Sequence, residues 1–329
     1  MSSLPRPRGP ITERLFEAWR RAPHALEPVT SEAVEDEDLH LALYCCYELH
    51  YRGFEGVDER WEWEPSLLAL RQALEQRFED ELHDLVGAPG EPPDPREVDA
   101  HLRELMLADE APSVSTFIER EATAEQLLEF MVHRSAYQLK EADPHSWALP
   151  RLHGKPKAAM VEVQSDEYGN GRDGELHAQL FERAMDAVGL DSTYGAYLEQ
   201  IPSVTLATVN LMSLFGLHRR LRGAIVGHLA LFEMTSSIPN RRYATGLRRL
   251  GYGEDACLFF DVHVVADAVH ESVAAVDLAG GLAAQDPRLG ADVLWGASAL
   301  LAIDGRWARH MMESWESGSS SLRPEFALR

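Results

Sequence analysis

The stretch His263-Val-Val-Ala-Asp267-Ala-Val-His270 lies inside a long segment, Glu254–Leu282, in which apolar residues recur with the period of an α-helix. At about 100° per residue, Asp267 falls roughly 40° from His263 around the helix, and His270 roughly 20° away on the other side. The three polar side chains therefore share one helix face over two turns. Because the residues between them are apolar, we expect this face to point inward, where polar groups need partners.

Imidazole and carboxylate groups together are typical ligands of iron, manganese and zinc. The spacing H-x3-D-x2-H therefore predicts a metal site on this helix face. A second interpretation stays open from these residues alone. A histidine with an aspartate four residues away is also found as a simple hydrogen-bonded pair on a helix surface.

The rest of the chain is also helical in pattern, with no internal repeat and no alternation of strands and helices. The expected helices are 11–21, 39–51, 61–86, 96–109, 113–120, 123–140, 157–167, 175–188, 204–217, 223–236, 239–250, 254–282 and 287–314. We therefore predict an all-α helix bundle. The proline-rich run Ala88–Pro95 suggests a division into a disordered segment 1–10, an N-terminal helical subdomain 11–110, a main domain 111–316 and a flexible tail 317–329.

Composition excludes several classes of function. The chain has 329 residues with 31 basic and 54 acidic side chains, so its formal charge is 31 − 54 = −23. This charge argues against binding to nucleic acid or to an anionic membrane, both of which need clustered Lys and Arg. The three cysteines, Cys45, Cys46 and Cys257, form no CxxC motif and rule out a disulfide scaffold, so we expect a cytoplasmic protein.

Residues 169–174 read Gly-Asn-Gly-Arg-Asp-Gly, which matches the GxGxxG pattern of dinucleotide-binding proteins. Five polar or aromatic residues separate the preceding apolar run from Gly169, whereas in a Rossmann fold the turn follows its strand directly. No second strand–helix unit follows. We therefore favour a flexible break between two helices.

Other carboxylates and histidines support the metal interpretation. Glu233 lies in an apolar helical run, where a lone buried carboxylate is costly unless it is paired or coordinated. Glu141 closes the helix 123–140, and Glu167 and His177 flank the glycines. Chemistry alone makes four further residues similarly eligible: His145, Glu162, Asp166 and His228. Carboxylates and histidines from several helices are typical of two-metal sites in bundles.

Taken together, these residues resemble the haem-oxygenase-like diiron oxidases, a group of iron-containing redox enzymes. The resemblance covers about residues 120–285 and rests on spacing: Glu167 follows Glu141 by 26 residues, His177 follows by 10 more, and Glu233 precedes His263 by 30. It implies a seven-helix, haem-oxygenase-like bundle without haem, here with extra N-terminal helices. It also implies two non-haem irons, or iron with manganese, held by Glu141, Glu167, His177, Glu233, His263, Asp267 and His270.

The resemblance further implies an oxidoreductase that uses dioxygen as cosubstrate. Members of the family N-oxygenate amines or guanidines, or cleave C–C bonds oxidatively. We therefore expect a small-molecule substrate, an electron donor such as a ferredoxin, a flavoprotein or a small reductant, and a homodimer. One glutamate, Glu167 or Glu233, would bridge the metals. In a continuous helix Glu167 and His177 would lie about 80° apart, so a break at the glycines has to bring them together.

Three alternatives remain open at this stage. The first is a catalytically inactive helical protein of the same fold that binds a metal or another ligand. The second is a haem protein of that fold, which needs one axial histidine and gives no reason for four carboxylate ligands. The third is a thiaminase-like hydrolase, in which Cys257 would be the nucleophile.

Overall fold

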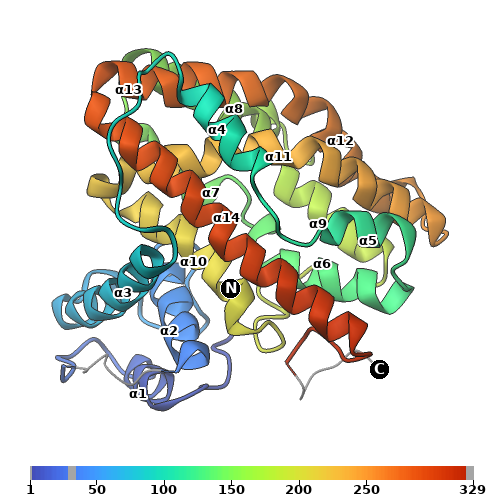
Figure 1. The fold of residues 1–329 in the computed structure, drawn as a ribbon. Helices are drawn as coiled ribbons and strands as arrows, with labels where there is room; N and C mark the ends of the chain where they lie inside the picture. The colour runs from blue at the N-terminus through green and yellow to red at the C-terminus, as the bar shows by residue number, and fades with distance from the viewer. Residues whose placement is uncertain (1, 29–34, 324–329) are drawn as a thin grey trace.

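The chain folds into a bundle of α-helices, as the computed structural model in Figure 1 shows. The model describes residues 2–28 and 35–323, and of 265 and 267–269 it describes only the backbone. The α-helices are α1 (Pro10–Trp19), α2 (Asp36–Glu48), α3 (Pro65–Val86), α4 (Val98–Leu107), α5 (Val114–Arg120), α6 (Ala124–Gln138), α7 (Asp143–Ser146), α8 (Gly154–Glu167), α9 (His177–Ala187), α10 (Ser203–Leu217), α11 (Arg222–Arg249), α12 (Glu254–Ser272), α13 (Gly281–Gln285) and α14 (Pro287–Glu316). Across the described residues there is no β-strand, so the all-α prediction is confirmed.

Helix α11 is the centre of the bundle and packs along α12 on one side and α14 on the other. Its contact with α14 is close because glycines lie at the crossing. A Cβ at Gly227 would stand only 1.8 Å from the carbonyl oxygen of Val293, and one at Gly296 only 2.2 Å from that of Ala224. The two backbones therefore touch without side chains between them, which fixes how α11 presents its residues to α12.

The structure corrects the predicted break between residues 236 and 239. Pro239 lies inside the continuous helix α11, although proline lacks the N–H that an interior helical position normally donates. The Ser236 hydroxyl bonds the carbonyl of Phe232 four residues earlier, a contact that bends a helix without ending it. A different feature interrupts the predicted helix 254–282, since α12 passes into a π-helix over Val273–Gly280 before α13.

The N-terminal segment differs from the expected disorder of residues 1–10. Ser2 forms a β-bridge with Phe54, and the Arg8 guanidinium donates to the carbonyl of Leu198 at 2.7 Å and to Glu37 at 2.8 Å. Prolines favour an extended chain, and here that extended chain runs along the bundle surface. Within the predicted tail 317–329, Ser321 is buried, and residues 324–329 lie outside the described part.

All three cysteines are buried and free, so none of them forms a disulfide in the described structure. Burial raises the pKa of each thiol, which disfavours the reactive thiolate. The Cys257 Sγ lies 3.8 Å from the carbonyl oxygen of Ala244 and has the role of a core residue, which speaks against the hydrolase alternative. None of the described helices combines the length and the apolar character needed to cross a lipid bilayer.

One buried histidine in α6 makes stability sensitive to acid. The ring nitrogens of His133 lie 2.6 Å from Thr205 Oγ1 and 3.1 Å from Ser321 Oγ, and burial lowers the pKa of His133 to about 3. In the unfolded chain its pKa is about 6.5. The unfolded state therefore binds a proton first, and as pH falls below about 6.5 folding stability is lost at up to about 1.4 kcal/mol per pH unit.

We expect His133→Gln to remove this share of the acid sensitivity. Urea unfolding of the wild type and the variant between pH 7 and pH 4 should show a free energy of unfolding that falls less steeply in the variant, by about 1 kcal/mol per pH unit. The exposed His153 provides a matched control, because His153→Gln should leave the slope unchanged. Parallel slopes for wild type and His133→Gln would contradict this explanation.

Candidate metal centre

Six of the seven expected ligands converge at the middle of the bundle, and all six are buried. The six residues can meet because most of them lie at helix ends or on helix faces that point into the bundle. They are Glu141 in the turn after α6, Glu167 at the end of α8, His177 at the start of α9, Glu233 in α11, and His263 and His270 two turns apart in α12. The side chain of the seventh, Asp267, lies outside the described residues, so its role as a ligand stays a prediction.

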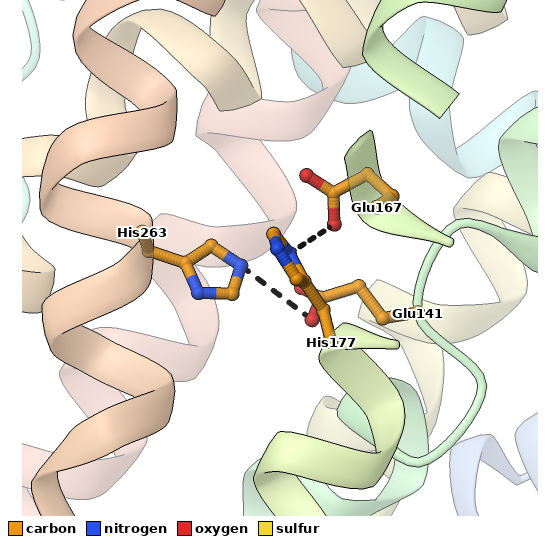
Figure 2. Close-up of side chains that lie close together, drawn as sticks. All are labelled: Glu141, Glu167, His177 and His263. Carbon is orange, nitrogen blue, oxygen red and sulfur yellow. Dashed lines mark ion pairs between the residues drawn. The ribbon is translucent and has the colours of Figure 1, made fainter. Parts of the chain in front are cut away.

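A first group contains Glu141, Glu167, His177 and His263, which Figure 2 shows directed toward one another. His177 Nδ1 lies 2.7 Å from Glu167 Oε2, and His263 Nε2 lies 3.6 Å from Glu141 Oε2. One potential ligand atom from each residue lies within 4.8 Å of all the others. Two ligands on one ion, each about 2.1 Å from it, stand at most about 4.2 Å apart, so small side-chain rotations suffice for the group to hold one ion.

A second group contains Glu167, Glu233 and His270. His270 Nδ1 lies 3.4 Å from Glu233 Oε2 and 3.9 Å from Glu167 Oε1, while its Nε2 lies 3.2 Å from Asp166 Oδ2. Glu167 belongs to both groups, with Oε2 directed to the first and Oε1 to the second. Of the two glutamates expected to bridge, the geometry therefore favours Glu167.

The glycine-rich turn is what brings Glu167 and His177 together. Helix α8 ends at Glu167, and Gly169 follows with φ +60°, a conformation that other residues adopt at a cost. A Cβ at Gly169 would stand 2.4 Å from the backbone of Glu175, so the loop folds tightly back on itself. The tight loop is the expected interruption of the helix between Glu167 and His177. The segment before Gly169 is helix and not strand, so the dinucleotide interpretation is wrong.

The donor atoms fit a cation better than they fit one another. His263 Nδ1 lies 2.7 Å from the carbonyl oxygen of Phe259, to which it donates, so its Nε2 turns a lone pair toward the Glu141 carboxylate. In the neutral imidazole both facing atoms are acceptors, so either a proton or a metal ion has to lie between them. Glu141 Oε2, His177 Nδ1 and His270 Nδ1 are buried and form no well-directed hydrogen bond among the described residues, although each lies near another side chain of its group. A metal ion would supply the missing interaction.

The protonation of the group follows from its burial. Burial raises the pKa of Glu167 to about 8, although His263 and His270 oppose the shift, and it also raises the pKa of Glu141. Burial lowers the pKa of His177 to about 4. Although burial opposes the shift, the hydrogen bond and charge of Glu233 raise the pKa of His270 to about 9, so a metal ion bound there would displace a proton from this imidazole.

Glu141 is held in place by residues from the N-terminal helices. Its neighbour Lys140 is buried and donates from Nζ to Glu48 of α2 at 2.9 Å. On the other side, Ala142 adopts φ +71°, which is uncommon for a residue with a side chain, and its carbonyl accepts a hydrogen bond from Gln164. Such conformations persist where the surroundings enforce them, so α2 and α8 together determine where the Glu141 carboxylate stands.

A cavity of about 250 Å³ opens directly beside the first group, and Glu141 and His263 form part of its wall. Most of the remaining wall is aromatic and aliphatic, including Phe181, Phe232 and Phe259. A cavity of this size and lining is suited to a small organic molecule. The described structure thus joins a candidate metal centre to a candidate substrate pocket.

Chemistry alone had made four other residues eligible as ligands, and none of them belongs to either group, although His145 lines a small cavity together with Glu141 and Glu167. His145 Nε2 and His228 Nδ1 lie 3.1 Å apart and pair with each other, while Glu162 is exposed on α8. Asp166 is the exception, because it contacts His270 from outside the second group. Its place next to Glu167 in the sequence gave no signal of this contact, since adjacent helical residues point in different directions.

Comparisons with known proteins identify the family of the chain. The family model for iron-containing redox enzymes matches residues 128–305, which is more than half of the chain and includes the positions of all the expected ligands. The chain is also similar to nitrosourea synthase from Streptomyces achromogenes subsp. streptozoticus, with 29% identity over 137 residues. That match covers 41% of this chain and 29% of the synthase, so the chain spans less than a third of that relative's length.

Proposed function

Because this chain belongs to the iron-containing redox enzyme family, with its haem-oxygenase-like fold, we propose that it is a non-haem diiron oxygenase that uses dioxygen to oxidise a small molecule. The observation that carries the proposal is the shared carboxylate: two groups of buried ligands meet at Glu167, one oxygen for each. A single structural metal would need only one of these groups. No cysteine belongs to either group, which favours iron or manganese over a structural zinc.

In this proposal Glu141, His177 and His263 hold one ion, and Glu233 and His270 hold the other. Glu167 belongs to both groups and would contribute one oxygen to each ion. Asp267, whose side chain lies outside the described residues, is a further expected ligand. When bound, two ferrous ions supply electrons that activate dioxygen for transfer of an oxygen atom. The family also includes centres of iron with manganese, and the same carboxylate-rich donor set suits both.

The residues of the chain would bind the ions, orient the ligand side chains and shield the metal centre from water. The Phe259 carbonyl keeps the His263 imidazole in one tautomer and one orientation, as contacts behind a ligand do in metal sites. The carboxylates would offset the charge of the ions, and Glu167 would bind in its ionised form. The aromatic wall of the cavity excludes water from the oxidising centre, so that the bound molecule is the group within reach.

Two reaction types fit this site. The name of the similar nitrosourea synthase supports oxygenation at nitrogen, and this is the reaction we favour. Oxidative C–C cleavage is the second candidate, because the largely apolar cavity wall beside Glu141 and His263 also suits a hydrocarbon chain. Repeated turnover in either case needs an external electron donor such as a ferredoxin, a flavoprotein or a small reductant.

The test is iron-dependent oxygen uptake by the wild type and by His263→Ala. We expect the rate of oxygen uptake to be more than about 100-fold lower in the variant than in the wild type, while the circular dichroism spectrum remains that of a helical protein. The exposed His153 again supplies a control, because His153→Ala should retain full uptake.

The outcomes separate the alternatives. Uptake that survives in His263→Ala would show that the ligand assignment is wrong. Iron binding with no uptake in the wild type would favour an inactive metal-binding protein of this fold. A Soret band in the purified protein would indicate haem instead.

A further inference from the structure

Asp166 lies directly outside the second group of ligands and has no role in the function proposed above. It precedes Glu167 by one residue near the end of α8. Its carboxylate oxygen Oδ2 lies 3.2 Å from Nε2 of His270, which is within hydrogen-bonding distance. This contact joins a residue at the bundle surface to a histidine that we expect to hold a metal ion.

The two ring nitrogens of His270 face different partners. Nδ1 lies 3.4 Å from Glu233 Oε2 and 3.9 Å from Glu167 Oε1, on the side where the potential ligand atoms of the second group gather. Nε2 points in a different direction, toward Asp166. An imidazole that binds a metal through one nitrogen keeps a proton on the other. The positions of the partners therefore favour Nδ1 as the binding atom and Nε2 as the protonated one.

His263, two turns earlier on α12, has the reverse arrangement. Its Nδ1 lies 2.7 Å from the carbonyl oxygen of Phe259 in the same helix, and its Nε2 faces Glu141 at 3.6 Å. The helix itself therefore holds the Nδ1 proton of His263. In His270 the proton to be held is on Nε2, so a partner from another helix is needed, and Asp166 of α8 is in that place.

Asp166 is in turn held by the glycine-rich turn that follows α8. Asn170 Nδ2 donates to Asp166 Oδ1 at 3.1 Å, so one carboxylate oxygen accepts from the amide while the other faces His270. Asn170 adopts φ +53°, a conformation that asparagine tolerates better than most residues with a side chain. The turn that brings Glu167 and His177 together thus also orients the carboxylate behind His270.

Burial and position distinguish Asp166 from a ligand. The side chains of Glu167, Glu233 and His270 are 5–7% exposed, whereas that of Asp166 is 39% exposed. Asp166 also does not belong to the set of potential ligand atoms that lie within 4.8 Å of one another. A carboxylate placed behind a histidine ligand is typical of metal sites, where it fixes the orientation of the ring and the nitrogen that carries the proton.

We propose that Asp166 is a positioning residue that accepts the Nε2 proton of His270, so that His270 binds the ion of the second group through Nδ1. His263 then binds the ion of the first group through the opposite nitrogen, Nε2. The inference rests on the proposed function, because it assigns a role in holding the second of two ions. Asn170 supports this role by fixing the carboxylate of Asp166.

NMR of the full-length protein, isotopically labelled in its histidine nitrogens, tests which nitrogen binds. The signals of His263 and His270 are assigned in metal-free protein from their loss in His263→Gln and His270→Gln. The wild type is then loaded with Zn(II), a diamagnetic ion that binds imidazole and carboxylate ligands. We expect Zn(II) to bind Nδ1 of His270 and Nε2 of His263, with a proton kept on Nε2 of His270. Binding of His270 through Nε2 would overturn the proposal.

Variants of Asp166 test whether its contact holds the ion. Asp166→Ala should weaken the binding of one of the two Zn(II) ions by about 10–100-fold in competition with a chelator, and the hydrogen-bonded Nε2 proton signal of His270 should be lost. Asp166→Asn, whose amide oxygen still accepts that proton, should recover part of the affinity. Glu162→Ala is the matched control, because it removes an exposed carboxylate one turn earlier on α8 and should leave both ions bound as in the wild type.

The pattern of losses decides between positioning and simple charge. An equal loss for both ions in Asp166→Ala, or the same loss in Glu162→Ala, would show that only negative charge near the site matters and would contradict the proposal. A loss confined to one ion, together with the lost proton signal of His270, is the result that the proposal predicts.

Asn170→Gly tests the contact behind Asp166. Glycine adopts positive φ without a steric penalty, so the variant preserves the turn and removes only the amide that donates to Asp166. We expect the same single ion to bind less tightly, with a smaller loss than in Asp166→Ala. Binding of that ion as tight as in the wild type would contradict the role assigned to Asn170.

Failure of this inference can be distinguished from failure of the proposed function. A wild type that binds two ions and consumes oxygen with iron, but whose affinities do not change in Asp166→Ala, would retain the proposed function and lose this inference. A protein that binds Zn(II) through Nδ1 of His270 but consumes no oxygen with iron would retain the inference and lose the oxygenase assignment. A wild type that binds no second ion would overturn both.

Discussion

Replacing Glu167 with glutamine should abolish binding of both metal ions, and with it all iron-dependent oxygen uptake. Glu167 directs Oε2 to the group of His177 and Oε1 to the group of His270, so its loss removes a negatively charged ligand from each. Neutral glutamine keeps the size of the side chain and removes the charge. We expect iron affinity to fall by more than about 100-fold, beyond the 10–100-fold loss typical when only a supporting contact is removed.

Variants of the unshared glutamates make this prediction specific. Glu141→Gln and Glu233→Gln each alter one group only, so each should retain one of the two ions. Glu162→Gln is the control on the same helix, because Glu162 is exposed and should leave two ions bound. The measurement is iron per chain after anaerobic loading and desalting. Two ions retained by Glu167→Gln, or one ion lost by Glu162→Gln, would refute the shared-carboxylate geometry.

Replacing Lys140 with methionine should be the most destabilising change outside the metal centre. Lys140 and Glu48 are each about 1% exposed in their side chains and lie 2.9 Å apart, and the Lys140 ammonium also rests 4.5 Å from the ring of Tyr44. The variant leaves the Glu48 carboxylate buried beside Tyr194 without a cation. We expect the free energy of unfolding to fall by about 3–5 kcal/mol in urea titrations.

A double variant distinguishes the buried charge from lost packing. Lys140→Met with Glu48→Leu removes both charges, so it should recover at least half of the stability lost in the single variant. The exposed pair Lys155–Asp277 serves as a control, and Lys155→Met should cost less than about 1 kcal/mol. If the double variant were as unstable as Lys140→Met, the buried charge would not explain the loss.

Much of the candidate site could be predicted from local sequence pattern. Helical periodicity places His263 and His270 on one face of α12, and an ionisable residue in an apolar run marks Glu233 as unusual. The remaining ligands depended on the resemblance to a family, since Glu141 and Glu167 lie at helix ends where periodicity no longer applies. The structure supports their convergence because the ends of α6 and α8 and the start of α9 meet side chains from within α11 and α12.

Long-range contacts could not be predicted in the same way. The pairing of Lys140 with Glu48 joins residues 92 apart in sequence, and nothing near either residue marks its partner. The cavity residues Arg134 and Asp304 carry no local mark of their position, because residues from several helices together form the cavity that they line. The continuity of α11 through Pro239 likewise depends on its packing between two helices, which overrides local preference.

The central claim is that two ions share Glu167, and Mössbauer spectroscopy tests it most directly. Metal-free protein would be loaded anaerobically with isotopically enriched Fe(II), freed of excess metal and measured before and after mixing with oxygenated buffer. We predict two irons per chain that become magnetically coupled ferric ions after oxygen is added, because one carboxylate bridges them. One iron per chain, or two that remain uncoupled and ferrous in the presence of oxygen, would contradict the account.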